Sequence, residues 1–247
     1  MVTAMPVPGT PVRSGPTDLT PRSAFPSPNC GPRRAGALPG LIVLHYTAMA
    51  TADGARRRLC NASAEVSAHY LIDEAGSVDA LVPEELRAWH AGAGSWGSVT
   101  DVNSHSIGIE LSNDGQSPFS SRQMLALVAV LADLRHRWSI PVERVIAHSD
   151  MAPTRKKDPG TRFDWHGLAH AGQAVWPQGN AVSAPDTDGF ADAARAFGYA
   201  ALPSDVLLAA FRLRFRPWAK GPLDAVDMGF ILDLTARFPV DATAPDA

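Results

Sequence analysis

The segment LIVLHY (41–46) follows Pro39-Gly40 and is a short apolar run with one histidine near its end. A short apolar run that begins after a turn is typical of a strand buried in a sheet. Four more segments have the same character: AHYLI (68–72), VDALV (78–82), SIGIEL (106–111) and RVIAH (144–148). A hairpin turn is predicted at IDEAG, between the first two of these four.

Helical patterns alternate with these strands. A short helix is predicted over residues 52–60, and a longer one over residues 121–138, where apolar side chains recur at helical spacing. Ser120 with Gln123 predicts a capping box at the start of the longer helix, and Pro141 lies just past its end. The sequence therefore predicts an α/β fold with one mixed β-sheet flanked by helices.

The composition divides the chain into four parts. Residues 1–25 are rich in proline and small polar residues and predict a disordered arm. Residues 26–180 hold the predicted strands and form the main domain. A linker is predicted at 181–188, within a stretch rich in Gly, Pro, Asp and Ser. Residues 189–240 predict a small C-terminal domain of three helices.

Three residues mark the boundaries of the C-terminal helices. Gly198 predicts the end of the first helix. Ser204 and Asp224 predict the N-caps of the second and third helices, since short polar side chains there accept hydrogen bonds from free backbone amides. A plain helical bundle that only packs on the main domain is the alternative to a separate functional module.

Composition and charge argue against several classes of protein. The chain is 45% hydrophobic and 19% charged, which is typical of a globular protein, and its net charge of -3 argues against nucleic-acid binding. No apolar run is long enough to span a bilayer. Cys30 and Cys60 form no C-x-x-C or zinc-finger pattern and are predicted to be free thiols. The N-terminus lacks a secretory signal, which favours a cytoplasmic location, with the periplasm or cell envelope as the alternative. We expect a monomer.

Polar residues at the ends of predicted strands carry the functional signal. His45 and His148 end two apolar strands, and Glu110 lies one position from the end of a third. Buried polar groups need partners, and strand ends can converge on one edge of a sheet. Each residue alone has an ordinary interpretation: a strand-end histidine is usually a hydrogen-bonded core residue, and a strand-end glutamate is usually solvated or paired with arginine.

The loop HSDMAPTRKKDPG (148–160) adds further charged residues next to His148. Its irregular, charged pattern predicts a loop and neither a helix nor a buried strand. The loop is either a solvated surface turn or part of a metal site. Asp158, which precedes Pro-Gly, would be an ordinary turn residue under the first interpretation.

Five motifs occur together in one order: LIVLHYTAM, SAHYLIDEAG, AWHAG, NSHSIGIELSN and HSDMAPTRKKDPG. In this order they resemble the type 2 N-acetylmuramoyl-L-alanine amidases, which are zinc enzymes. The resemblance implies a mixed sheet flanked by helices. It also implies hydrolysis of the amide between the lactyl group of N-acetylmuramic acid and L-alanine, in peptidoglycan or muropeptides, during cell-wall turnover or recycling.

The resemblance makes His45, His148 and Asp158 the zinc ligands. Two imidazoles and a carboxylate suit catalytic zinc, because three protein ligands leave the fourth position for water. Asp150 is a rival ligand only two residues past His148, but it lacks the family match.

The resemblance also implies catalytic roles for two residues. Glu110 matches the family's strand carboxylate and is the candidate base, and Lys156 matches the lysine expected to stabilise the oxyanion. Lys157 is expected to be a solvated loop charge.

A weaker set matches family positions that line the substrate groove or support the metal: Tyr46, His69, Trp89, His90 and Arg155. Each could equally be a packing residue, and His69 also fits a core or metal-supporting role. The C-terminal helices resemble the peptidoglycan-binding domain that follows many such amidases. Two other functions remain open: a recognition protein of the same fold that binds peptidoglycan without cutting it, and a zinc hydrolase of another amide.

Overall fold

The computed structural model describes residues 25–182 and 184–241. The predicted arm at 1–25 therefore lies, except for its last residue, outside the described residues. No helix within the described ranges is long and apolar enough to cross a bilayer.

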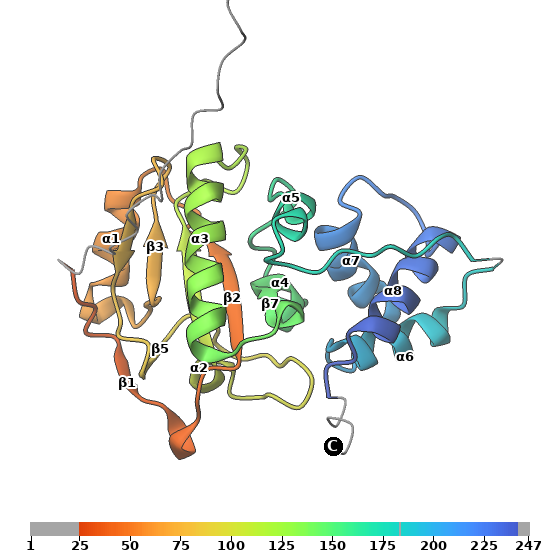
Figure 1. The fold of residues 1–247 in the computed structure, drawn as a ribbon, viewed down its shortest axis with the longest axis horizontal. Helices are drawn as coiled ribbons and strands as arrows, with labels where there is room; N and C mark the ends of the chain where they lie inside the picture. Colours follow the sequence, from red (N-terminus) through yellow and green to blue (C-terminus); the bar gives the residue numbers. More distant parts are fainter. Residues whose placement is uncertain (1–24, 183, 242–247) are drawn as a thin grey trace, which may run out of the picture.

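A five-stranded sheet in the order β4-β3-β6-β2-β7 forms the centre of the molecule (Figure 1). The strands β3, β6, β2 and β7 run parallel, and β4 pairs antiparallel with β3, which confirms the predicted hairpin. The bounds of these strands are β2 (Leu41–Tyr46), β3 (Tyr70–Ile72), β4 (Val78–Ala80), β6 (Ser106–Leu111) and β7 (Val145–Ala147). The mixed sheet with flanking helices agrees with the fold expected from the sequence.

A second, two-stranded sheet pairs β1 (Cys30–Pro32) with β5 (Leu86–Ala88) in antiparallel fashion. Neither strand has an apolar run that would predict it. Three short 3-10 helices span Arg34–Gly36, Ala62–Ala64 and Val142–Arg144. The α-helices are α1 (Ala52–Leu59), α2 (Val102–His105), α3 (Ser121–Trp138), α4 (His148–Met151), α5 (Trp165–His170), α6 (Thr187–Phe197), α7 (Ser204–Phe215) and α8 (Ala225–Arg237).

The two faces of the central sheet have different roles. Because side chains alternate along a strand, Ile42 and Leu44 face the opposite way from Val43 and His45. Ile42 and Leu44 belong to the core beneath α3, which lies along the sheet in Figure 1. On the other face, His45 is the register partner of Glu110 on β6. One face of the sheet is thus buried in this core, and the other face carries His45 and Glu110 at the carboxyl ends of β2 and β6.

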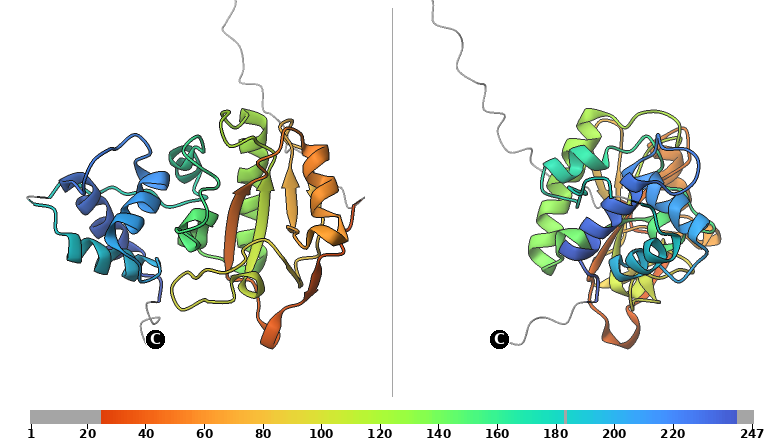
Figure 2. Two further views of the ribbon diagram at one scale, coloured as in Figure 1. Left: turned by 180° about the vertical axis from the view of Figure 1, so that it is seen from behind. Right: turned by 90° about the vertical axis from the view of Figure 1, so that its right-hand side faces the viewer.

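The C-terminal helices α6, α7 and α8 lie beyond β7, next to α4 and α5 (Figures 1 and 2). Their apolar side chains join one cluster with residues of the sheet, including Leu41, Val43 and Ile146. α7 contacts both α4 and α5. The helices therefore complete the hydrophobic core on the β7 side of the sheet.

The prediction of a loop over residues 148–160 was wrong for its first four residues. β7 ends at Ala147, and His148 to Met151 form the short helix α4. The helix is stabilised because a carboxylate oxygen of Asp150 accepts a hydrogen bond from the Ala147 amide at 2.9 Å. His148 is therefore the first residue of a helix. The side chain that caps this helix belongs to Asp150, two residues further along the chain.

Two predicted caps also differ from the structure. Ser120 accepts the amide of Gln123, but the Gln123 side chain donates to the carbonyls of Ile72 and Ser112, which lie at strand ends. Burial against the sheet thus takes Gln123 away from the reciprocal bond of a capping box. The N-cap of α7 is Pro203, whose carbonyl accepts the first helical hydrogen bond, so Ser204 already lies inside the helix.

Candidate metal centre and active-site cavity

Three predicted side chains converge at the carboxyl ends of β2 and β7. His45 Nδ1 lies 2.8 Å from His148 Nδ1, and the Oδ2 atom of Asp158 lies 3.0 Å from the first and 2.9 Å from the second. All three residues are buried. Among the described residues they form the one group of histidine, cysteine or acidic side chains arranged to hold a metal ion.

The hydrogen bonds behind His148 determine which of its nitrogens carries a proton. Its Nε2 lies 2.9 Å from the carbonyl oxygen of Ala91. A carbonyl can only accept, so Nε2 must donate, and Nδ1 of the neutral ring keeps a lone pair. That lone pair faces the other two groups of the cluster.

A longer relay gives the same result for His45. The hydroxyl of Ser106 donates to the carbonyl oxygen of Val102 at 2.5 Å, so its oxygen accepts from His90 Nε2 at 3.1 Å. His90 Nδ1 is then the acceptor for His45 Nε2 at 3.0 Å. His45 Nδ1 is therefore unprotonated, because the ring donates from Nε2.

Both imidazole lone pairs and a carboxylate oxygen thus point at one another in a buried space. Such an arrangement is repulsive unless a cation lies between the three atoms. Burial and the neighbouring His148 lower the pKa of His45 to about 4, which favours the neutral ring that a metal requires. The donor set fits a divalent metal.

A cavity of about 450 Å³ opens above this cluster. Its lining includes Glu110, whose Oε2 atom is buried without a hydrogen-bond partner in the described part of the chain. Burial, together with the charge of Asp158, raises the pKa of Glu110 to about 8, and Lys156 opposes this shift. The cavity therefore contains an acid–base group, Glu110, whose Oε2 atom forms no hydrogen bond with the described residues.

The other predicted site residues are divided between the cavity and the core. Half-buried Lys156 lines the cavity, as do Tyr46, Trp89 and His90. Arg155 also lines it, but its guanidinium donates to the carbonyl of Ala93 at 2.9 Å and so holds the loop in place.

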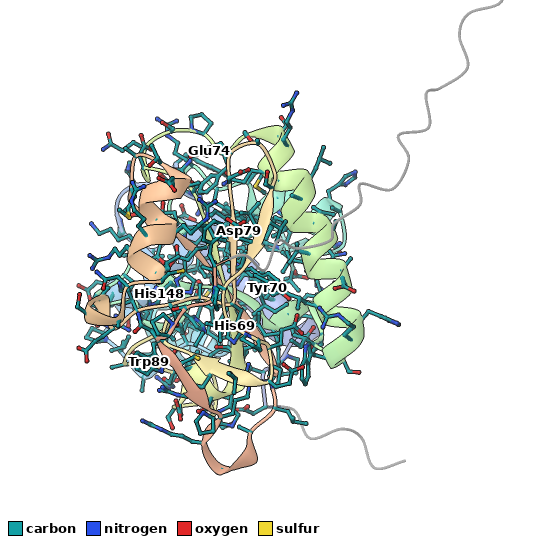
Figure 3. All side chains as sticks on the ribbon, turned by 90° about the vertical axis from the view of Figure 1, so that its left-hand side faces the viewer. His69, Tyr70, Glu74, Asp79, Trp89 and His148 are labelled. Carbon is teal, nitrogen blue, oxygen red and sulfur yellow. The ribbon has the colours of Figure 1, made fainter. Side chains whose placement is uncertain are left out.

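His69 does not line the cavity. It is fully buried, accepts the Gly108 amide at 2.9 Å through Nδ1, and lies 3.1 Å from the Leu86 carbonyl oxygen through Nε2. Figure 3 shows His69, His148 and Trp89 in the same part of the view. The hydrogen bonds of His69 make it a core histidine. Its bond to Gly108 stabilises β6, the strand that also carries Glu110.

The structure brings further residues to the site that the sequence did not single out. Arg58 and Met49 line the cavity from α1 and the segment before it. The side chain of Asn103 accepts the amides of His90 and Ala91, which fixes the turn that carries both. None of these residues lies at a strand end or in a charged cluster with the metal ligands, so spacing alone could not identify them.

Comparison with known proteins agrees with this geometry. A family model described as N-acetylmuramoyl-L-alanine amidase (Amidase_2) matches residues 35–161. The N-acetylmuramoyl-L-alanine amidase AmiD of Escherichia coli (strain K12) is 34% identical over 209 residues, which are 72% of this chain and 75% of AmiD. The 1,6-anhydro-N-acetylmuramyl-L-alanine amidase AmpD of Enterobacter cloacae is 42% identical over 100 residues, 40% of this chain and 54% of AmpD.

The structure of E. coli AmiD, in complex with anhydro-N-acetylmuramic acid-L-Ala-D-gamma-Glu-L-Lys, superposes with a TM-score of 0.75 and 30% identity. The alignment covers 91% of this chain and 96% of AmiD, so it reaches beyond the residues that the family model matches. The chain belongs to the N-acetylmuramoyl-L-alanine amidase family and is an enzyme of that class, and His45, His148 and Asp158 form its candidate metal site.

Proposed function

We propose that the protein is a zinc-dependent amidase that cleaves the bond between the lactyl group of N-acetylmuramic acid and L-alanine in muropeptides or peptidoglycan. The observation that carries this proposal is the convergence of three lone-pair donors at the base of a cavity that also holds Glu110. The AmiD complex with a muramyl peptide supports the same substrate class.

Zinc is the metal that this donor set suits best. Two imidazole nitrogens and one carboxylate oxygen are common ligands of catalytic zinc, and no cysteine lies in the cluster. Zinc bound there would act as a Lewis acid, lowering the pKa of water and polarising the scissile carbonyl. The Ala91 carbonyl and the His90–Ser106 relay hold His148 and His45 in the tautomers that this requires.

Glu110 is proposed to move the proton. When Glu110 is ionised, its unpartnered Oε2 can accept a hydrogen bond from a water molecule in the cavity. Once protonated, a carboxyl whose pKa is raised by burial can return that proton to the leaving amine of L-alanine. A cation at the neighbouring ligands would lower this pKa and favour the ionised form before the reaction.

Lys156 is proposed to stabilise negative charge that develops on the scissile carbonyl oxygen. Lys156 and Lys157 both line the cavity that holds Glu110, but Lys156 is half-buried and Lys157 is exposed. A positive charge in a partly desolvated cavity acts more strongly than one in water. Tyr46, Trp89 and His90 are proposed to contact the substrate or shape the groove.

The C-terminal helices are proposed to bind the glycan part of peptidoglycan, in line with the resemblance of residues 189–240 to such domains. Trp218, which follows α7, is 67% exposed, and an exposed aromatic ring offers an apolar face on which a sugar can stack. Under the alternative, the helices only complete the core of the amidase half.

The deciding experiment is mass spectrometry of the products formed from intact sacculi and from a soluble anhydro-muropeptide, with and without a chelator. Chelator-sensitive release of free stem peptide is expected, and His148→Ala should abolish it. Glu110→Ala should keep zinc and lose activity. Zinc binding without cleavage of either substrate would instead favour a recognition protein. Cleavage confined to other amides in a substrate panel would favour a hydrolase of different specificity.

A further inference from the structure

A fully buried ion pair joins the C-terminal helices to α4, the short helix that begins with His148. Arg214 of α7 donates from Nη1 to Oδ2 of Asp150 in α4 at 2.7 Å, and both side chains are 0% exposed. The hydroxyl of Tyr199, between α6 and α7, donates to the other oxygen of Asp150 at 2.8 Å. Two residues of the C-terminal part thus hold one carboxylate of the amidase part.

The carboxylate of Asp150 is hydrogen-bonded to the backbone next to the metal ligand His148. Besides Arg214, Oδ2 of Asp150 accepts the amide of Ala147, the residue before His148. Arg214 also donates from Nη2 to the carbonyl of Val145 in β7 at 3.1 Å. The guanidinium therefore bridges the strand that ends before His148 and the helix that begins with it.

The guanidinium of Arg214 packs against two aromatic rings. Its guanidinium carbon lies 4.2 Å from the ring centre of Trp165 and 4.9 Å from that of Phe215. Its Nε atom is buried without a hydrogen-bond partner among the described residues. Burying such a pair incurs a large desolvation penalty, and apolar residues of similar volume often stabilise a protein equally well. The pair is thus better explained by the geometry it imposes than by stability alone.

We infer that Arg214, with Asp150 and Tyr199, is a positioning residue that sets the orientation of His148 towards the metal. The C-terminal helices are then part of the machinery of the metal site, whatever they bind. This inference rests on the metal site of the proposed function. It differs from a purely structural role because it predicts an effect on metal affinity that exceeds the effect on folding.

The chain offers a matched control. Arg212, also in α7, forms a buried pair with Asp227 of α8, whose side chain is 0% exposed, and donates to the carbonyls of Gly221 and Pro222. This second pair lies entirely within the C-terminal part. Arg212→Met and Arg214→Met each remove a buried cation from the same helix, and only the second change touches α4. Asp227 keeps Arg216 as a partner when Arg212 is replaced.

The test measures zinc affinity by competition with a chromophoric chelator in the full-length wild type and both variants. Circular dichroism checks folding at the same temperature. Loss of partners that orient a metal ligand typically weakens metal binding by about 10–100-fold. We expect about tenfold weaker zinc binding for Arg214→Met and less than about twofold change for Arg212→Met. Amide exchange of residues 147–152 in the zinc-free protein should also accelerate only in Arg214→Met.

The outcomes separate this inference from the proposed function. A wild type that binds no zinc would contradict the proposed function. Zinc binding by the wild type with equal losses in both variants, or with no loss in folded Arg214→Met, would overturn the inference. If Arg214→Met does not fold, Tyr199→Phe decides, since it removes one hydrogen bond to Asp150 and keeps the ion pair. Weaker zinc binding in Tyr199→Phe supports the inference, and unchanged affinity overturns it.

Discussion

Replacing Glu110 with glutamine should separate the stability of this enzyme from its activity. Burial and the charge of Asp158 raise the pKa of Glu110 from 4.5 to about 8 in the metal-free protein. At pH 7 the unfolded chain ionises this carboxyl while the folded protein keeps it protonated. Each pKa unit corresponds to about 1.4 kcal/mol, so the folded state loses up to about 3 kcal/mol relative to a neutral side chain. Water in the cavity screens part of this, and a gain of at least ~1 kcal/mol is expected for Glu110→Gln.

The sign of the effect depends on pH in a defined way. The folded pKa of Glu110 lies above its unfolded value, so the folded state binds more protons between pH 4.5 and about 8. The energetic penalty from Glu110 is therefore smallest below pH 4.5 and grows as the pH rises towards 8. Because glutamine resembles the protonated acid in shape and charge, Glu110→Gln should match the wild type at pH 4.5 and exceed it at pH 7.

The assay is urea unfolding of chelator-treated wild type and Glu110→Gln at pH 4.5 and pH 7. Amidase activity and zinc affinity are measured on the zinc-loaded proteins. Activity should fall by about 10²–10⁴-fold, the usual contribution of a general acid–base group, while zinc remains bound. An equal free-energy difference at both pH values would refute the reasoning about the carboxyl. Retained activity would refute the catalytic role.

Three further predictions concern the metal ligands and their supports. His148→Ala should abolish both zinc binding and amidase activity, because it removes one of three ligands; atomic absorption after dialysis measures the first and product analysis the second. Burial lowers the pKa of His69 to about 4, below its ordinary 6.5, so the unfolded state binds more protons between these values. The free energy of unfolding should then fall by about 3 kcal/mol from pH 6.5 to pH 4 through this residue alone, and urea unfolding should show that loss reduced in His69→Gln. Gly108→Ala should destabilise the protein by about 1–3 kcal/mol and weaken zinc binding, since the new methyl group would lie 2.4 Å from the His90 ring; unchanged zinc affinity would contradict the proposed relay to His45.

The strands were predictable because their pattern is local. The segments around β2 and β6 are short apolar runs bounded by turns, and the helix over residues 121–138 has the bounds that its periodicity predicted. The strands β1 and β5 were missed because neither contains an apolar run, and each is paired with the other. Their stability comes from a contact between distant segments, which no local pattern records.

The metal ligands could be identified from the order of the motifs, but their chemistry could not. Asp150 and Asp158 are both acidic residues near His148, and spacing alone does not distinguish them. In the structure Asp158 meets the two histidines, whereas Asp150 is bound by Ala147, Tyr199 and Arg214. The packing of the C-terminal helices therefore decides which carboxylate stays available for a metal.

The sequence by itself determined the class of fold, the family, and the identity of the His45, His148 and Asp158 cluster, because apolar periodicity, turn residues and motif order are properties of neighbouring residues. Only the tertiary structure decided the tautomers of the histidines, the burial that raises the pKa of Glu110, and the junction of Arg214 with Asp150 across 64 positions of sequence. The physical reason is that hydrogen-bond direction, desolvation and buried charge pairing depend on which distant groups surround a side chain, and folding alone brings those groups together.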